Sequence, residues 1–482
     1  MTRNDVADLY AIAAMPGLEE FAAIIDEHDT VKRRRSNAVT LAFFVVGKAV
    51  LGSADRLDSL LRIPMIWELL RSSASAVGRT FSSRPPTVDQ VDALRQRIPD
   101  LGARLAEALP RVAVPLAKQA GLLAGEAPEE LSDLQRSNVV AADGSVFRPY
   151  SDVFVDAEGT VRGSRAEPEK TGRQARPSQR YRGKSDGPGA KGYPVSVASV
   201  HGGERWQRVM LGVELYRDGH EMAASERLLD RVIAAAGGGV HAVVYDRLMA
   251  GVHMHHLLAT HGVVPIARRK GADKNGAGLT LPESRVRYLA DKSTDSHKAI
   301  KRRVTTQLLS EATHSANGGC YHELWSVDGA LVPVPFGEQV SIDHPPAERV
   351  ALRRHRAGAG YRVEGTYRIP CVHGDFEHTI DFTAPRPGRR SSRTWVTTVL
   401  SPIPEEDPAF DDLNALRSDV ESVFSTIKSR LPWKRSNKLS LDGFLLDVVA
   451  SIMHNNAVCW DIHVSGHSEP LYDQPVSVSV AA

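Results

Sequence analysis

The amino-acid sequence predicts an α/β protein: a helical N-terminal region, then a mixed sheet flanked by helices, and a β-rich insertion. Three patterns indicate this class. Residues 1–130 show helical periodicity, residues 131–267 alternate strand-like with helical segments, and residues 268–400 contain short segments of alternating polarity. The chain has 482 residues, which is enough for two or three domains and a large core.

The N-terminal region, residues 1–130, contains four apolar segments at helical spacing. They are Val6–Ala23 with a break at Pro16, Ala38–Leu51, Leu57–Leu70, and Thr87–Leu109 with Thr87 as an N-cap. A basic run at Lys32–Arg35 and a loop rich in Ser and Arg at Arg71–Arg84 favour DNA binding by this region. No recognition helix stands out, and an ordinary helical bundle explains the same pattern.

Residues 131–267 are predicted to form the first part of an α/β core. The expected elements are a strand over 139–146, antiparallel strands Tyr193–Val200 and Gln207–Glu214, helix Glu221–Ala235, strand Val240–Tyr245, helix Val252–Thr260 and strand Val263–Ala267. Two of these strands lead into an aspartate, Asp143 and Asp246. Segment 162–191 carries nine Lys/Arg against three Asp/Glu, which predicts a flexible basic loop.

Residues 268–400 combine a second basic segment with the β-rich insertion. Segment 268–303 has eleven Lys/Arg against four Asp/Glu, and short alternating segments follow from Tyr321 to Val399. Residues 401–464 are expected to complete the core with a Pro- and acid-rich linker, a helix over Arg417–Lys428 and a closing helix over Phe444–Trp460. Residues 465–482 are predicted to be a tail.

The Arg417–Lys428 helix places charged side chains close to one face. Arg417, Glu421 and Lys428 are spaced i, i+4 and i+11, while Val420, Phe424 and Ile427 form an apolar stripe. A carboxylate between two cations suits a site for a divalent cation and a phosphate. A solvated helix face with an Arg–Glu pair is the simpler reading of this segment alone.

Asp143 and Asp246 strengthen the first interpretation. Each lies just past the end of a predicted strand, where α/β proteins build their sites, and Glu421 lies on a helix. Three carboxylates that meet repel one another unless a cation neutralises them, and hard oxygen ligands favour Mg²⁺ or Mn²⁺. Two such ions would serve an in-line phosphoryl transfer.

The order Asp143, Asp246, Glu421 resembles that of the DDE transposases of bacterial insertion sequences. In one subgroup the glutamate lies in Tyr-(2)-Arg-(3)-Glu-(6)-Lys, which this chain matches at Arg417, Glu421 and Lys428 but not at Asn414, the tyrosine position. The dipeptide at Asp246 and Arg247 and the β-like stretch before Glu421 are similar to that subgroup too. The resemblance covers about Val139 to Trp460 and implies a ribonuclease-H-like catalytic core.

The resemblance implies a metal-dependent endonuclease and strand-transfer enzyme that moves a mobile element by DNA recombination. Asp143, Asp246 and Glu421 would hold two Mg²⁺ or Mn²⁺ ions, and Arg417, Lys428 and Arg247 would contact DNA. The implied partners are the terminal inverted repeats, the target DNA and a second copy of the chain. Two alternatives stay open, namely a domesticated or inactive DNA-binding descendant and a related metal-dependent DNA nuclease.

Composition bounds the compartment and the cofactors. Net charge is +2, and no signal-peptide pattern or membrane-span-length apolar run is present, so we expect a cytoplasmic protein. The resemblance implies a bacterial protein associated with the nucleoid. Three cysteines cannot build a disulfide framework. The Cys371–His373 stretch with His378 and Cys320 fits no standard zinc-finger spacing. Trp325 and Trp395 are expected to pack in the insertion, although in related transposases such a tryptophan stacks on a flipped base.

Overall fold

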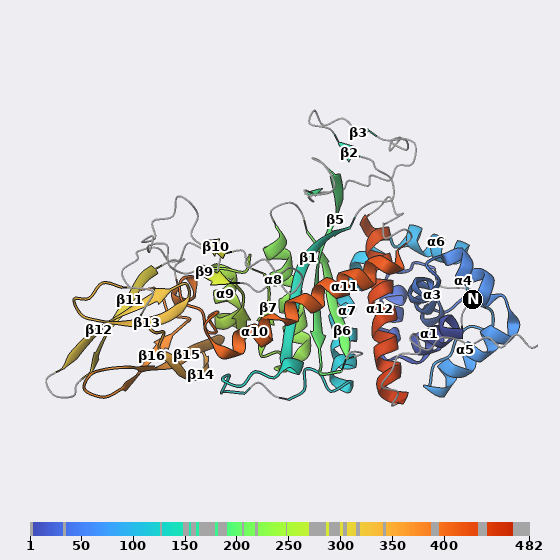
Figure 1. The fold of residues 1–482 in the computed structure, drawn as a ribbon. Coiled ribbons are helices and arrows are strands. Elements are labelled where there is room, and N and C mark those ends of the chain that lie inside the picture. Colours follow the sequence, from blue (N-terminus) through green and yellow to red (C-terminus); the bar gives the residue numbers. More distant parts are fainter. Residues whose placement is uncertain are drawn as a thin grey trace, which may run out of the picture. The chain divides into compact units, whose positions relative to one another are not determined.

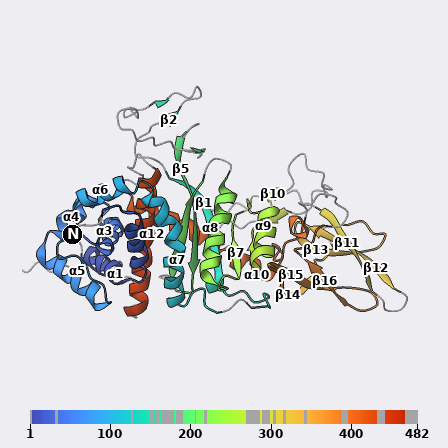
Figure 2. The same cartoon turned by 180° about the vertical axis from the view of Figure 1, so that it is seen from behind.

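The structure, a computed structural model, belongs to the mixed α/β class, as predicted (Figures 1 and 2). It describes residues 3–31, 35–125, 128–147, 154–155, 161–162, 179–181, 190–204, 207–216, 220–246, 248–268, 286–288, 299–301, 306–314, 319–340, 344–386, 395–431 and 441–465. Internal contacts divide the chain into two compact units. Unit 1 comprises Met1–Gly125, Val140–Gly239 and Ser418–Ala482, and unit 2 comprises Glu126–Val139 and Val240–Arg417.

Unit 1 begins with seven helices among the described residues. They are α1 (Arg3–Ala14), α2 (Leu18–His28), α3 (Ala38–Leu51), α4 (Ala54–Leu61), α5 (Pro64–Ala76), α6 (Val88–Arg97) and α7 (Leu101–Gln119). The predicted break at Pro16 is confirmed, and Thr87 caps α6 in a capping box with Gln90. The single helix predicted over Leu57–Leu70 is wrong, because Pro64 opens a new helix at its first position.

Buried aromatic side chains hold these helices together. Phe43 on α3 lies 5.0 Å from Phe81 between ring centroids, and Trp67 on α5 stacks on Phe81 at 5.8 Å. Helix α3 is almost entirely buried. Within the described residues no single helix is long and apolar enough to cross a membrane, and α3 with α4 passes that test only as a pair bent by 112°.

The sheet of unit 1 is antiparallel. Strand β1 (Val139–Phe147) pairs with β5 (Ala190–His201), with Asp143 opposite Val197, and β5 pairs with β6 (Arg208–Leu215). Strand β4 (Gln179–Tyr181) pairs with the start of β5, and β2 (Phe154–Val155) pairs with β3 (Val161–Arg162). The predicted basic loop 162–191 otherwise lies outside the described residues.

Helices cover the two faces of β1. Helix α11 (Leu416–Arg430) crosses one face and α8 (Glu221–Ala236) lies on the other (Figures 1 and 2). A Cβ atom built on Gly144 would meet the Glu221 carboxylate at 2.3 Å, so even-numbered residues of β1 face α8. Phe147 packs against Phe424 of α11, so odd-numbered residues face α11.

Helix α12 (Leu441–Ser465) ties the sheet to the N-terminal helices. The Asn456 side chain accepts a hydrogen bond from the backbone N–H of Met210 at 3.0 Å and donates one to the Met210 carbonyl at 2.8 Å. These two bonds satisfy backbone groups of the edge strand β6. Lys48 of α3 and Asp447 of α12 form an ion pair at 2.7 Å. The N-terminal helices thereby share one compact unit with the sheet.

Unit 2 contains a parallel strand pair and two antiparallel sheets. Strands β7 (Ala242–Val244) and β8 (Val264–Ile266) are joined through α9 (Val252–His256) and a π-helical turn, η3 (Leu257–His261). The β-rich insertion contains β11 (Thr306–His314), β12 (Cys320–Val327), β13 (Ala330–Pro335), β14 (Glu348–Ala357), β15 (Gly360–Ile369) and β16 (Phe376–Asp381). These six strands form two three-stranded sheets, β11–β12–β13 and β14–β15–β16.

Shorter elements complete unit 2. They are β9 (Val286–Tyr288), β10 (Ala299–Lys301) and α10 (Pro408–Asn414), with single 3₁₀ turns at Arg136–Asn138 and Val396–Thr398. Strands β9 and β10 pair antiparallel, and most of the predicted basic segment 268–303 lies outside the described residues. Buried Arg354 of β14 donates to the carbonyls of Pro128 and Gly262, and this burial lowers the pKa of its guanidinium.

Candidate functional site

Asp143 lies in the middle of β1, on the face of the strand that α11 crosses. Ser145 and Phe147 share this face with Asp143, because side chains alternate along a strand. The Asp143 side chain is half-buried, and its Oδ1 accepts a hydrogen bond from the Gly144 backbone at 2.8 Å. The predicted strand that begins at Val139 is confirmed, but the prediction that Asp143 lies just past its end is wrong, because β1 continues to Phe147.

The C-terminal half of α11 is attached to β1 through Lys428. Its ammonium donates to the Ser145 hydroxyl at 3.0 Å and lies 5.1 Å above the ring of Phe147 and 5.9 Å from that of Phe424. Lys428 therefore places a positive charge two residues from Asp143, on the same face of the strand. We had expected Lys428 to contact DNA phosphates, and that role stays a prediction.

The N-terminal half of α11 is attached to the β5–β6 hairpin through Asp419. One Asp419 oxygen lies 2.8 Å from His201 Nδ1, and the other accepts from Arg208 Nη2 at 3.4 Å. His201 and Arg208 are register partners at the end of β5 and the start of β6. All three side chains are less than a quarter exposed, so His201 and Arg208 bind Asp419 in a partly dehydrated setting.

These two attachments fix the level of Glu421 relative to Asp143. Because His201 follows the residue paired with Val140, Asp419 lies near the start of β1 and Lys428 near its end, so helix and strand run in the same direction. Glu421 precedes Lys428 by two helical turns, about 10.5 Å, and Asp143 precedes Ser145 by about 6.6 Å of strand. Glu421 and Asp143 thus both precede the Lys428–Ser145 contact, on α11 and β1 respectively.

Glu421 also lies on the side of α11 that carries Lys428. Seven residues advance an α-helix by about 20° less than two full turns, so both side chains leave the helix on nearly the same side. Glu421 is exposed, whereas Val420 and Phe424 beside it are buried. Asp143 thus lies on the face of β1 that α11 crosses, and Glu421 lies on an exposed side of α11. Arg417 is half-buried one turn before Glu421.

Asp246 belongs to unit 2, directly after the buried Tyr245 that follows β7. Its Oδ1 accepts a hydrogen bond from the Leu248 backbone at 2.7 Å, so the half-buried carboxylate begins a turn at the strand end. The predicted buried strand before Asp246 is confirmed. Arg247, which we expected to contact DNA, lies outside the described residues.

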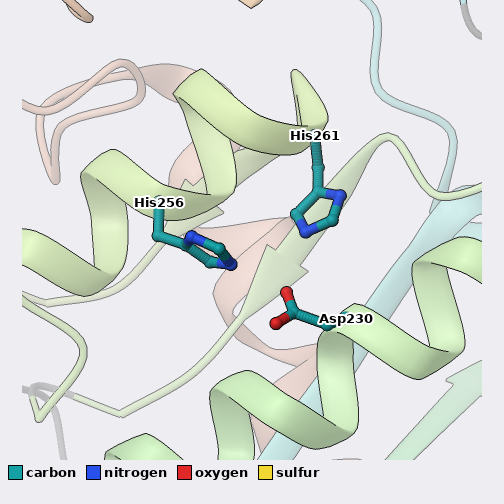
Figure 3. A group of neighbouring side chains, drawn as sticks. All are labelled: Asp230, His256 and His261. Carbon is teal, nitrogen blue, oxygen red and sulfur yellow. The ribbon is translucent and has the colours of Figure 1, made fainter. Parts of the chain in front are cut away.

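The predicted ligands belong to both units, since Asp143 and Glu421 lie in unit 1 and Asp246 in unit 2. The convergence of these three carboxylates on Mg²⁺ or Mn²⁺ stays a prediction. Figure 3 shows three other side chains that are able to ligate a metal: Asp230 on α8 of unit 1, and His256 and His261 of unit 2.

His256 directly precedes the π-helical turn η3 and His261 is its last residue, with their ring centroids 5.3 Å apart. Three carboxylates would suit Mg²⁺ and Mn²⁺, whereas imidazoles suit Zn²⁺ and other transition ions.

Asp419, His201 and Ser145 were missed by sequence reasoning. Asp419 lies two residues before Glu421, but its partners come from a hairpin more than 200 positions away, and no local pattern predicts that pairing. Ser145 adjoins the Asp143–Gly144 pair that drew attention to β1. Only the fold shows that these side chains attach α11 to the sheet.

Both tryptophans of the insertion make packing contacts. Trp325 packs against Val327, Val332 and Val334 and donates from its indole N–H to Glu323 at 2.9 Å. Trp395 stacks on His255 at 4.0 Å between ring centroids. One face of the Trp395 ring is therefore already covered by His255, whose pKa is lowered chiefly by burial.

Comparison with known proteins adds no family assignment. The chain matches no model of a known protein family and no functionally characterised protein.

Proposed function

We propose that this chain is a metal-dependent DNA transposase that cleaves the ends of a mobile element and joins them to target DNA. The observation that carries the proposal is that α11, the helix with Glu421, crosses the face of β1 on which Asp143 lies. The sequence resemblance names these same two residues as metal ligands.

The order of elements along the chain supports a ribonuclease-H-like core. Three antiparallel strands, β1, β5 and β6, come first, and α8, β7, α9 and β8 follow, with β7 and β8 parallel. Helix α11 with Glu421 comes last, after the β-rich insertion. This is the order that a ribonuclease-H-like catalytic core with an insertion before its last helix requires.

The donor set fits the metal that the proposal needs. Asp143, Asp246 and Glu421 offer hard carboxylate oxygens, and Mg²⁺ or Mn²⁺ held by them would activate a water or a 3′-hydroxyl and offset the charge of the leaving oxygen. Lys428, fixed over the rings of Phe147 and Phe424, brings a positive charge to the same side of β1. We assign Lys428 and Arg417 to the negative phosphodiester.

The substrate in this proposal is double-stranded DNA with terminal inverted repeats. Water first cuts the phosphodiester at the element's end, and the freed 3′-hydroxyl then attacks the target, so no covalent enzyme–DNA bond is needed. Two ends must be joined together, and we therefore propose that two copies of the chain act on one pair of ends. Asp419, with His201 and Arg208, keeps α11 in register with β1 throughout.

The test is Mg²⁺-dependent cleavage of DNA that carries the inverted repeats flanking the gene. Glu421→Gln should lower cleavage by at least about a hundredfold, because it removes a metal ligand, while leaving DNA binding intact. Glu107→Gln is the charge-matched control, since Glu107 is exposed on α7. A Glu421→Gln variant that cleaves like wild type refutes the catalytic assignment.

Two other outcomes would replace the proposal by its alternatives. Specific binding to the repeats without cleavage by the wild-type chain would identify a DNA-binding descendant. Cleavage that never leads to joining would identify a nuclease. Binding is read from a native gel shift, and cleavage and joining are read from a denaturing gel of the same reaction.

A further inference from the structure

Two of the three cysteines lie near each other within unit 2. Cys320 is the first residue of β12, and Cys371 lies two residues past the end of β15. The neighbouring Cys371 thiol helps to raise the pKa of the Cys320 thiol, and both side chains are half-buried. They come from different three-stranded sheets of the insertion, so the pair lies where the two sheets meet.

The surrounding side chains hold these two strand ends together. His314 is the register partner of Cys320, and its ring stacks on Phe376 of β16 at 4.7 Å between centroids. The ring of buried His322 lies 5.5 Å from the same phenyl ring. Phe376 in turn pairs with Ile369, the last residue of β15. Ring packing and strand pairing therefore place Cys320 beside Cys371.

The third cysteine provides an internal contrast. Cys459 is buried in α12 and donates its S–H to the carbonyl of Arg208 at 3.0 Å, and burial raises its pKa to about 11. Thiolate is the reactive form of cysteine, so Cys459 should stay reduced under conditions that oxidise accessible thiols.

We propose that Cys320 and Cys371 form a reversible intramolecular disulfide that joins the two sheets of the β-rich insertion. This site is independent of the proposed catalytic function. With oxidised glutathione as oxidant, one protein thiolate attacks its S–S bond and releases one glutathione thiol. The second protein thiolate then attacks the mixed disulfide and releases a second glutathione, while the two protein thiol protons pass to the released thiols or to solvent.

A metal site is the competing explanation for a thiol pair beside two histidines. Two thiolates and two imidazoles would suit Zn²⁺. Among the described residues, however, neither cysteine belongs to a group of three ligand atoms within 4.8 Å of one another. A pair of neighbouring thiols without a third close ligand favours the disulfide.

The test exposes the full-length reduced protein to oxidised glutathione and measures its intact mass. We expect the wild-type chain to lose two hydrogen atoms and to yield one cross-linked peptide that joins tryptic fragments 304–349 and 369–389. Cys320→Ser and Cys371→Ser each lack the second thiol, so each should instead retain one glutathione on the remaining cysteine. Cys459 should stay unmodified in all three proteins.

The thermal midpoint gives a second readout. Because the cross-link closes a long loop of the unfolded chain, the oxidised wild-type protein should melt several degrees higher than the reduced protein. The two serine variants should show no such shift. Desolvation and the neighbouring thiol raise the pKa of Cys320, so the incubation should last hours at neutral pH.

Three results would overturn the proposal. They are a wild-type protein that accumulates glutathione on Cys320 or Cys371 without a cross-link, cross-links between different chains, and one zinc ion per purified chain that is lost in both serine variants. None of these results bears on DNA cleavage, so the disulfide and the transposase proposals fail separately.

Discussion

Removing the Asp419 carboxylate tests how α11 is held on the sheet of unit 1. Asp419→Ala deletes contacts to His201 at 2.8 Å and to Arg208 at 3.4 Å and leaves the two basic groups side by side without their shared anion. A hydrogen bond to a charged group contributes about 1.5–3 kcal/mol to stability, and an exposed ion pair contributes only about 0.2–1 kcal/mol.

The exposure of the three side chains decides between those two ranges. Asp419 is 16% exposed, and His201 and Arg208 are 12% and 23% exposed, so solvent screens the contacts only in part. We therefore expect Asp419→Ala to lower the free energy of unfolding by about 2–3 kcal/mol. The control is Asp92→Ala on α6, because Asp92 is 57% exposed and its ion pair with Arg95 should contribute under about 1 kcal/mol.

Urea denaturation followed by circular dichroism measures the difference. A loss of stability at an unchanged slope with denaturant appears as a lower midpoint concentration. His201→Gln combined with Asp419→Ala gives a double-mutant cycle, in which we expect a coupling energy of at least about 1 kcal/mol. If Asp419→Ala and Asp92→Ala have the same midpoint, the attachment of α11 through Asp419 is refuted.

Three other perturbations test the packing. Burial lowers the pKa of His454 despite its hydrogen bond to Asp8, so the unfolded chain binds a proton at a pH where the folded protein does not. The free energy of unfolding should therefore fall as the pH drops through about 6.5, the ordinary pKa of histidine. This fall should be less steep in His454→Gln. A Cβ atom on Gly360 would lie 2.2 Å from a backbone carbonyl oxygen of η3, so Gly360→Ala should lower the free energy of unfolding by about 1–3 kcal/mol. The control is Gly203→Ala, whose Cβ would meet no atom within 4 Å and which should leave the melting temperature unchanged. Asn456→Leu should lower the free energy of unfolding by about 2–4 kcal/mol, because it leaves the backbone N–H and carbonyl of Met210 in β6 without their side-chain partner. Denaturant titration measures this loss, and near-wild-type stability would contradict the role of Asn456 at this strand.

Local patterns predicted the elements well where they depend on local signals. The Thr87 cap, the break at Pro16 and the strands on both sides of His201 all follow from neighbouring residues. The single helix predicted over Leu57–Leu70 is wrong because the apolar pattern was taken as continuous. Pro64 instead occupies the first turn of a new helix, α5, where proline is favourable. The π-helical end of the helix after Asp246 has no sequence signature that we recognise.

The candidate site was predictable only in part. The spacing of Glu421 and Lys428 predicted a shared face of one helix, and Asp143 stood out beside a glycine in an apolar strand. Which strand the helix crosses depends on contacts distant in sequence, such as Lys428 with Ser145 and Asp419 with His201. Such contacts arise from tertiary packing, which a single sequence does not encode in any short pattern.

The central claim is that Asp143, Asp246 and Glu421 bind the same divalent cation. Titration of the full chain with Mn²⁺, followed by electron paramagnetic resonance of the free ion, tests it directly. Asp143→Asn, Asp246→Asn and Glu421→Gln should each weaken binding at least about tenfold, because each removes a ligand. His256→Ala should leave that binding unchanged, since His256 is not among the proposed ligands. Wild-type Mn²⁺ affinity in all three carboxylate variants, or its loss only in His256→Ala, would contradict the account.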